Sequence, residues 1–288
     1  MFILTYNIGF KALDEKIEIL QINDIFNVFY ESPLEITTDE YGYGYFEKEV
    51  NSIEIKIAYD EDKDYLESFK EKVSSLLNSD CISVEEVNYD YENYDFPTIK
   101  INDNWVLASP NDDICDKNIS KISFISQGAF GTGLHETTKD LLNIILTKID
   151  LTDKKVLDIG TGSGILSIAS AIIGASKVTA LDIRDVKGEV NLNASLNGIY
   201  NIETLIGNAL NGEITINDKF DWIYINIGGE ETELFMEFIK DHLLNNGKIL
   251  VSGLVEWSFD KVKSIVESHG FKLEEKYQTN EWITAIFN

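Results

Sequence analysis

Val156-Leu-Asp-Ile-Gly-Thr-Gly-Ser-Gly164 is the stretch of sequence that decides the fold. Val156, Leu157 and Ile159 form the short apolar run that is typical of a parallel strand covered on both faces. Three glycines at every second position permit a tight turn in which the backbone approaches a ligand closely. Apolar residues follow at helical spacing from Ile165 onward. We therefore expect a strand, a glycine turn and a helix of an α/β sheet.

The ligand of this turn is suggested by the acids around it. The spacing GxGxG differs from the GxGxxG of dinucleotide-binding loops, whose last glycine is replaced here by Ile165. Asp158, two residues before Gly160, disfavours a pyrophosphate but suits the sulfonium and ammonium of S-adenosylmethionine. Asp182 ends a second apolar strand about 20 residues after Gly160, where an acid binds ribose hydroxyls. A turn that only needs positive φ is the alternative for the glycines alone.

Composition limits the classes of protein that the chain can belong to. Its 288 residues suggest two domains, and 44% hydrophobic residues suffice for real cores. A formal net charge of −26 argues against direct binding to nucleic acid, because phosphates would be repelled. A basic protein partner fits this charge better, although the acidity can equally serve solubility in the source organism.

Neither a metal nor a membrane is indicated by the sequence. Cys81 and Cys115 lie far apart without His or Cys at ligand spacing, so we expect reduced thiols, no disulfide and no metal site. The first ten residues lack the features of a signal peptide, and no apolar run reaches 18 residues. We therefore expect a cytoplasmic protein, and we expect it to be a monomer.

The first 90 residues predict a small α+β domain. Strands and helices alternate in the order strand, helix, strand, strand, helix, strand, which is typical of a ferredoxin-like module. The expected ranges are 2–8, 11–20, 25–30, 52–58, 65–77 and 82–87. The aromatic stretch 41–46 is either a half-buried hairpin end or a partner contact. We expect a linker and hairpin over 91–118, with Asn88–Tyr94 leading into it, and a ligand-binding domain over 119–288.

Two further segments of that domain carry candidate site residues. Ser126–Thr138 is a glycine-rich loop that precedes a helix expected over 139–148, where Thr137 or Thr138 could simply cap the helix. Asn226 ends the apolar strand that begins at Phe220, which places it at the sheet edge where open α/β sheets bind ligands. A structural asparagine in a turn is the alternative. Asn208 follows another strand and is a candidate for contact with an adenine.

These segments resemble a known family. Gly128-Ala-Phe-Gly-Thr-Gly-Leu-His-Glu-Thr-Thr138 and Leu157-Asp-Ile-Gly-Thr-Gly-Ser-Gly164 are similar to motifs of the PrmA family, the methyltransferases of ribosomal protein L11. The resemblance extends over Leu181-Asp-Ile183, Asn226-Ile227 and Leu250-Val-Ser-Gly-Leu254. It covers about residues 95–288, and the front of the chain only in size and element order. The two motifs together are specific, whereas the glycine loop alone fits any class I methyltransferase.

The resemblance implies a fold, a cofactor and site residues. We expect a Rossmann-like sheet that binds S-adenosylmethionine through Thr138, Gly160, Asp182 and Asn226. Gly162, Gly164 and Asp158 belong to the same loop region, and Asn208 is the adenine candidate. Methyl transfer from a sulfonium depends mainly on holding an amine in line with the methyl, and Asn226 is the residue expected to orient that amine. For His135, a general base is one interpretation and a loop contact or gate is the other.

The chain departs from the family pattern in places that concern the substrate. Ser126-Gln127-Gly128 stands where Asp-Pro-Gly is usual, Gly228-Gly229 replaces an apolar pair, and Asp182-Ile-Arg-Asp185 replaces Asp-Ile-Asp-Pro. The expected activity is methylation of lysine or terminal amines of a ribosomal protein, with the front module recognising that substrate. Methylation of another protein or of a small molecule, and a binding protein without turnover, are the alternatives.

Overall fold

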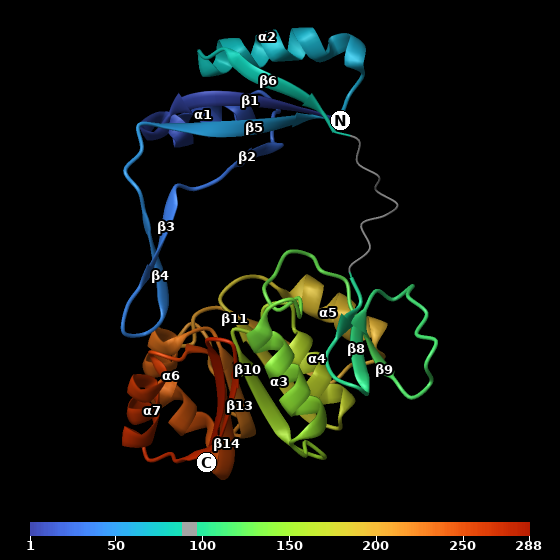
Figure 1. Ribbon diagram of the computed structural model, residues 1–288, viewed down its shortest axis with the longest axis vertical. Helices are drawn as coiled ribbons and strands as arrows, with labels where there is room; N and C mark the ends of the chain where they lie inside the picture. Colours follow the sequence, from blue (N-terminus) through green and yellow to red (C-terminus); the bar gives the residue numbers. More distant parts are fainter. Residues whose placement is uncertain (88–96) are drawn as a thin grey trace. The chain divides into compact units, whose positions relative to one another are not determined.

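A computed structural model describes residues 1–87 and 97–288 (Figure 1). The chain divides into two compact units, one made of Met1–Thr38 with Tyr43–Tyr94 and the other of Asp39–Gly42 with Asp95–Asn288. The linker expected over Asn88–Tyr94 lies outside the described residues. Residues 97–118, which we expected to complete a linker and hairpin, fall in the second unit.

The first unit is an antiparallel sheet with two helices. Its strands run in the order β2-β5-β1-β6, which confirms the ferredoxin-like expectation. Alternate residues of β5, among them Ile53, Ile55 and Ile57, are buried in a core shared with α1 and α2. The elements are β1 (Phe2–Gly9), η1 (Phe10–Ala12), α1 (Leu13–Ile22), β2 (Val28–Tyr30), β5 (Ser52–Tyr59), η2 (Lys63–Tyr65), α2 (Leu66–Leu77) and β6 (Cys81–Glu86).

The aromatic stretch after residue 40 forms one arm of a separate hairpin. Strand β3 (Leu34–Thr38) pairs with β4 (Tyr43–Glu47), so the stretch is part of a hairpin. It is not half-buried as expected, because Tyr43, Tyr45 and Phe46 are exposed, and its contact with a partner stays a prediction. The turn between them is built by Asp39, whose Oδ1 accepts hydrogen bonds from the amides of Tyr41 and Gly42 at 2.8 and 3.0 Å. An aspartate that binds its own backbone two residues on is a common way to close a tight turn.

The second unit is built on a seven-stranded sheet, in the order β12-β11-β10-β13-β14-β16-β15. The strands from β12 to β14 pair in parallel, and β16 inserts antiparallel between β14 and β15. This arrangement confirms the class I methyltransferase sheet. Its strands are β10 (Lys155–Ile159), β11 (Lys177–Asp182), β12 (Ile202–Ile206), β13 (Phe220–Asn226), β14 (Leu243–Val255), β15 (Leu273–Thr279) and β16 (Trp282–Phe287).

Helices cover both faces of this sheet (Figure 1). One apolar core lies under α3 (Glu136–Thr147), α4 (Ile165–Ile172) and α5 (Lys187–Leu196), and a second lies under α6 (Gly229–His242) and α7 (Phe259–Ser268). The central strand β13 contributes Trp222 and Tyr224 to the first core and Ile223 and Ile225 to the second. Burial on both faces is what its continuous apolar run requires.

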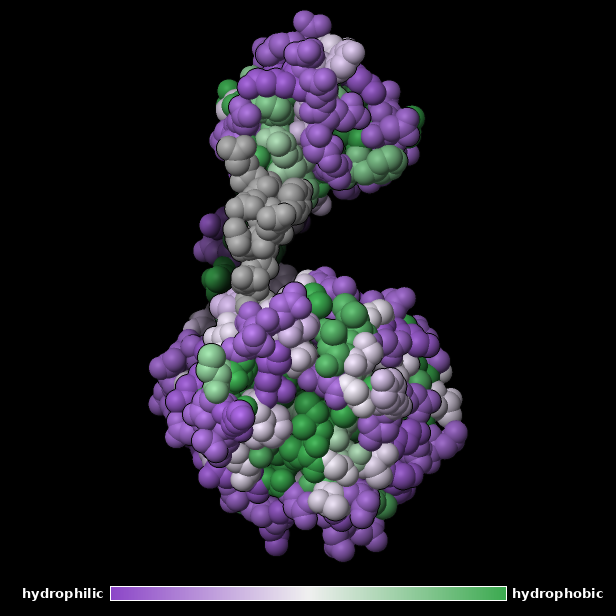
Figure 2. Space-filling view, turned by 90° about the vertical axis from the view of Figure 1, so that its right-hand side faces the viewer, coloured by the Kyte–Doolittle hydropathy of each residue, from purple (hydrophilic) through white to green (hydrophobic). Residues whose placement is uncertain are grey.

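A small three-stranded sheet precedes these elements. Strands β7 (Ile99–Lys100) and β8 (Trp105–Ala108) form the expected hairpin, and β9 (Ser120–Ser123) joins β8 in parallel. Over the described residues, no helix is both long and apolar enough to cross a membrane. The face drawn in Figure 2 is mostly hydrophilic, with apolar patches set among polar side chains, as the composition of an acidic globular protein leads one to expect.

Candidate active site

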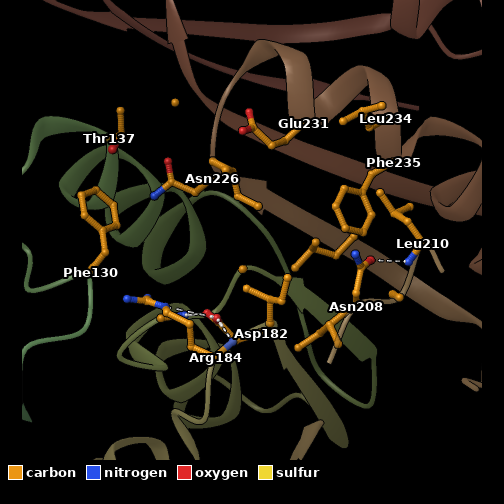
Figure 3. Close-up of a pocket in the computed structure, with 18 of the residues that line it drawn as sticks. Phe130, Thr137, Asp182, Arg184, Asn208, Leu210, Asn226, Glu231, Leu234 and Phe235 are labelled. Carbon is orange, nitrogen blue, oxygen red and sulfur yellow. Dashed lines mark hydrogen bonds and ion pairs between the residues drawn. The ribbon is translucent and has the colours of Figure 1, made fainter. Parts of the chain in front are cut away.

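A pocket opens where the strand order of the second unit reverses, between β10 and β13 (Figure 3). Its volume is about 660 Å³, which is within the range of small-molecule sites. The residues that line it come from the carboxyl ends of the parallel strands β10 to β14, from the loop and helix start that precede β10, from the start of α6 and from β16. They include Phe130, Thr137, Gly160, Gly162, Asp182, Arg184, Asn208, Leu210, Asn226, Glu231, Leu234 and Phe235. Sequence reasoning had chosen Gly160, Gly162, Asp182, Asn208 and Asn226 from this set.

The glycine loop has the backbone conformation that its residues predict. Gly160, Gly162 and Gly164 have φ of 69°, 54° and 78°, which other residues rarely adopt. A Cβ on Gly162 would lie 2.4 Å from the carbonyl oxygen of Phe130, and one on Gly160 would lie 2.7 Å from Ile227. Gly164 faces Val190 of α5 instead of the pocket. It therefore permits close packing of the helix that follows.

Every backbone amide from residue 160 to 164 already donates a hydrogen bond within the protein. The amides of Gly160 and Thr161 donate to the Leu181 carbonyl, that of Ser163 to the Phe130 carbonyl and that of Gly164 to the Thr161 carbonyl. The Gly162 amide donates to Oδ2 of Asp182 at 2.9 Å. A loop that cradles phosphates needs free amides that point at the anion. This loop offers none, so its geometry disfavours a dinucleotide or a nucleoside phosphate.

Asp182 lies at the end of β11 with its carboxylate on the pocket wall. Its side chain is 6% exposed, and its Oδ1 accepts a hydrogen bond from the Arg184 amide at 3.0 Å. The guanidinium of Arg184 is 3.6 Å from the same oxygen and is itself largely exposed. Each carboxylate oxygen has two lone pairs, so both can still accept a hydroxyl from a ligand. The position suits a pair of ribose hydroxyls.

Asp158 lies beneath the glycine loop and not in the pocket lining. Its Oδ2 accepts hydrogen bonds from the hydroxyls of Thr161 and Ser167 at 2.7 and 2.8 Å. Burial raises the pKa of this carboxyl above its usual value, and the two hydroxyls oppose that rise. Asp158 therefore holds the glycine loop through Thr161 and Ser167. Its contact with a cofactor ammonium stays a prediction.

A side chain that sequence reasoning did not select holds the glycine-rich loop that begins at Ser126. Glu189 of α5 is 7% exposed and accepts hydrogen bonds from the amides of Gln127 and Ala129 at 3.0 and 3.2 Å. Four residues later, Asn193 exchanges two hydrogen bonds with the backbone of Ile125. The two side chains stand one helical turn apart, so one face of α5 fixes the loop. The spacing alone does not reveal these contacts, because Ala129 lies 60 residues before Glu189 in the chain.

The start of α3 is organised by His135. Its Nδ1 accepts a hydrogen bond from the Thr137 amide, so the capping residue of α3 is His135 and not Thr137 or Thr138 as considered from the sequence. This is the loop contact of the two interpretations, and because His135 also lines the pocket its role as a general base stays a prediction. Thr137 lines the pocket, whereas Thr138 is fully buried, and within the described residues its hydroxyl has no hydrogen-bond partner. The role of Thr138 in cofactor binding stays a prediction.

Asn226 and Asn208 stand at opposite parts of the lining (Figure 3). The side-chain amide of Asn226 makes no hydrogen bond with any described residue, so it is available to a ligand. Asn208 accepts a hydrogen bond from the Leu210 amide at 2.9 Å through its Oδ1, which leaves its NH₂ group to donate. Leu210 and Phe235 add apolar surface beside it, as an aromatic base requires.

These groups fit S-adenosylmethionine. The Asp182 carboxylate can accept hydrogen bonds from the ribose hydroxyls, and Asn208 with its apolar neighbours can hold the adenine. The glycine loop has no free amide to bind a phosphate. The methionine end would then lie toward Phe130, Thr137 and Asn226. Its sulfonium is favoured by the acidic character of the pocket.

Comparison with known proteins agrees with this chemistry. The family model "Ribosomal protein L11 methyltransferase (PrmA)" matches residues 9–288. A ribosomal protein L11 methyltransferase of Staphylococcus epidermidis is 27% identical over 76% of this chain and 75% of that protein. One from Prochlorococcus marinus is 31% identical over 60% of this chain and 57% of its own length.

A solved structure shares the fold. The crystal structure of a ribosomal protein L11 methylase from Lactobacillus delbrueckii subsp. bulgaricus is 28% identical, with a TM-score of 0.59. The match covers 66% of this chain and 97% of that one. With the family model matched almost from end to end, the chain belongs to the PrmA family of S-adenosylmethionine-dependent methyltransferases.

Proposed function

We propose that this chain transfers methyl groups from S-adenosylmethionine to amines of ribosomal protein L11, on lysine side chains or at a terminal amine. Its family membership supports the reaction and the relatives support the substrate. The observation that carries the proposal is the unpaired amide of Asn226 at the rim of a pocket whose other end suits ribose and adenine. A net charge of −26 also favours a basic protein substrate.

The residues of the pocket do what such a reaction needs. When bound, S-adenosylmethionine supplies a methyl group on sulfur that is already a good leaving group. Asp182 holds the ribose end and Asn208 the base, which fixes the position of the methyl group. The side-chain oxygen of Asn226 accepts a hydrogen bond from the substrate amine and so directs its lone pair at the methyl carbon. Orientation of this kind accounts for most of the rate in a displacement without general acid catalysis.

The first unit is the proposed substrate-recognition domain. Its hairpin carries exposed large side chains, with Ile36 at 75% and Tyr45 at 74% exposure. Apolar and aromatic side chains held outward on a strand pair are typical of a surface that contacts a protein partner. Replacing Ile36 and Tyr45 by alanine is expected to weaken binding of the protein substrate and to leave cofactor binding unchanged.

The proposal is tested by incubating the full chain with isotopically labelled S-adenosylmethionine and purified ribosomal protein L11. Intact-mass and peptide mass spectrometry should show added methyl groups on amines of L11. A set of other ribosomal proteins and small amines serves as the comparison. Methylation of one of these in place of L11 would contradict the proposed substrate, and cofactor binding without any transfer would contradict the proposed activity.

A further inference from the structure

Glu231 is a charged residue of the pocket that the proposed roles leave unused. It lies in the first turn of α6, lines the pocket and is half-buried, on the same side of the pocket as Asn226 (Figure 3). Its carboxylate folds back over the turn that follows β13. A Cβ built on Gly228 would lie 2.7 Å from Oε2 of Glu231. The carboxylate therefore stands over the backbone two residues after Asn226.

The ordinary explanation of a glutamate at this position does not account for it. A glutamate at the third residue of a helix often accepts a hydrogen bond from the amide of the capping residue. Glu231 makes no hydrogen bond or ion pair with any of the described residues, the Gly228 amide included. The other charged side chains of the lining, Asp182 and Arg184, face each other. Glu231 is therefore the lining residue whose charge is not compensated within the described part of the chain.

We propose that Glu231 receives the amine of the substrate. This inference rests on the proposed function, because it assumes an amine acceptor. The substrate reaches the pocket as a cationic ammonium, which donates a hydrogen bond to the Glu231 carboxylate beside Asn226. The carboxylate takes one proton from it, which leaves a neutral amine with a free lone pair and a protonated Glu231. Since Glu231 is only half-buried, it then releases this proton to water.

Two features of the pocket favour this step. The bound sulfonium is a positive charge near the ammonium, and like charges lower the pKa of the amine. The apolar side chains of Leu234 and Phe235 lie beside Glu231 in the lining (Figure 3), and apolar surface beside a carboxylate strengthens its hydrogen bond to a cation. Glycine at 228 is what leaves room for the carboxylate. A side chain at position 228 would displace it, because its Cβ would lie 2.7 Å from Oε2.

The inference can be tested by ligand binding without turnover. Sinefungin carries an amino group on carbon where the cofactor carries its methyl sulfonium, whereas S-adenosylhomocysteine is neutral there. Calorimetric titration gives the ratio of the Kd of S-adenosylhomocysteine to the Kd of sinefungin. This ratio should favour sinefungin in the wild type and should fall by about tenfold or more in Glu231→Gln. Glu230→Gln, on the exposed face of the same turn, is the matched control and should keep it. Equal ratios in all three proteins would overturn the inference.

A second variant guards against a folding defect. Gly228 has an extended backbone, with φ of 178°, so alanine fits the backbone and displaces only the flexible carboxylate. Gly228→Ala should therefore reproduce the loss seen in Glu231→Gln. With L11 as substrate, Glu231→Gln should raise KM for L11 or lower kcat. The Kd of S-adenosylmethionine should change by a smaller factor than the ratio of the Kd values of S-adenosylhomocysteine and sinefungin. Failure of wild type to methylate L11 counts against the proposed function, and the ligand ratios still decide the role of Glu231.

Discussion

Replacing Gly162 by alanine should damage the site more than replacing any solvent-facing glycine. At a φ of 54° an alanine costs about 1–2 kcal/mol, because its Cβ crowds the following carbonyl. That Cβ would also lie 2.4 Å from the Phe130 carbonyl oxygen, which accepts the Ser163 amide at 2.9 Å. Moving the carbonyl away weakens this hydrogen bond, which contributes about 1 kcal/mol. The total is about 2–3 kcal/mol of unfolding free energy.

Gly198→Ala is the matched control for this prediction. Gly198 has a φ of 68°, and a Cβ there would have no atom within 4 Å, so only the backbone cost applies. Thermal unfolding followed by circular dichroism should show a loss of roughly 4–12 °C for Gly162→Ala and a smaller loss for Gly198→Ala. Calorimetry should show weaker binding of S-adenosylmethionine for Gly162→Ala alone, because Phe130 lines the pocket. Equal effects in the two variants would refute the role assigned to this close contact.

Three further changes test other parts of the structure. Asn226→Ala should reduce kcat by tenfold or more with little change in the Kd of S-adenosylmethionine, and unchanged turnover would exclude its role in orienting the amine. Glu189→Ala removes two charge-assisted hydrogen bonds to backbone amides and should cost about 2–3 kcal/mol in a urea titration. Lys155 and Lys177 hold the pKa of Asp218 at about 2. The ion pairs of Asp218 with these two lysines therefore stabilise the fold fully above about pH 4, the region of an ordinary aspartate pKa. This stabilisation is lost as the pH falls through about 2, where Asp218 becomes protonated. Asp218→Asn should flatten the dependence of Tm on pH between these values, and an unchanged slope would contradict the assignment.

The sequence was most informative where local pattern and tertiary structure agree. Alternation in β5 and the continuous apolar run of β13 predict a half-covered and a fully covered strand, and both are observed. The glycines after β10 and the acid that ends β11 predict a site at one edge of the sheet. Parallel strands that end in polar residues bring those residues together whatever the details of the loops.

Contacts between distant segments could not be predicted in the same way. Glu189 reaches a loop 60 residues earlier in the chain, and its sequence neighbourhood reads as an ordinary helix start. His135 caps α3 although threonines are the stronger capping residues by type, because the loop before it is fixed by tertiary contacts. Strand β14 already begins at Leu243 and runs through Asn245-Asn-Gly247, although those three residues are typical of a helix stop, and its register with β13 shifts between Leu243 and Lys248. The position of the Glu231 carboxylate depends on the space beside Gly228, which only the structure shows.

Calorimetric titration of S-adenosylmethionine into the wild-type chain and into Asp182→Ala tests the central claim most directly. The site described above predicts one saturable site per chain in the wild type and at least a tenfold weaker affinity in the variant, which loses the acceptor for the ribose hydroxyls. NAD and ATP should not compete, because the glycine loop has no free amides for their phosphates. Absence of binding, equal affinity in the two proteins, or displacement by either phosphate-bearing nucleotide would contradict it.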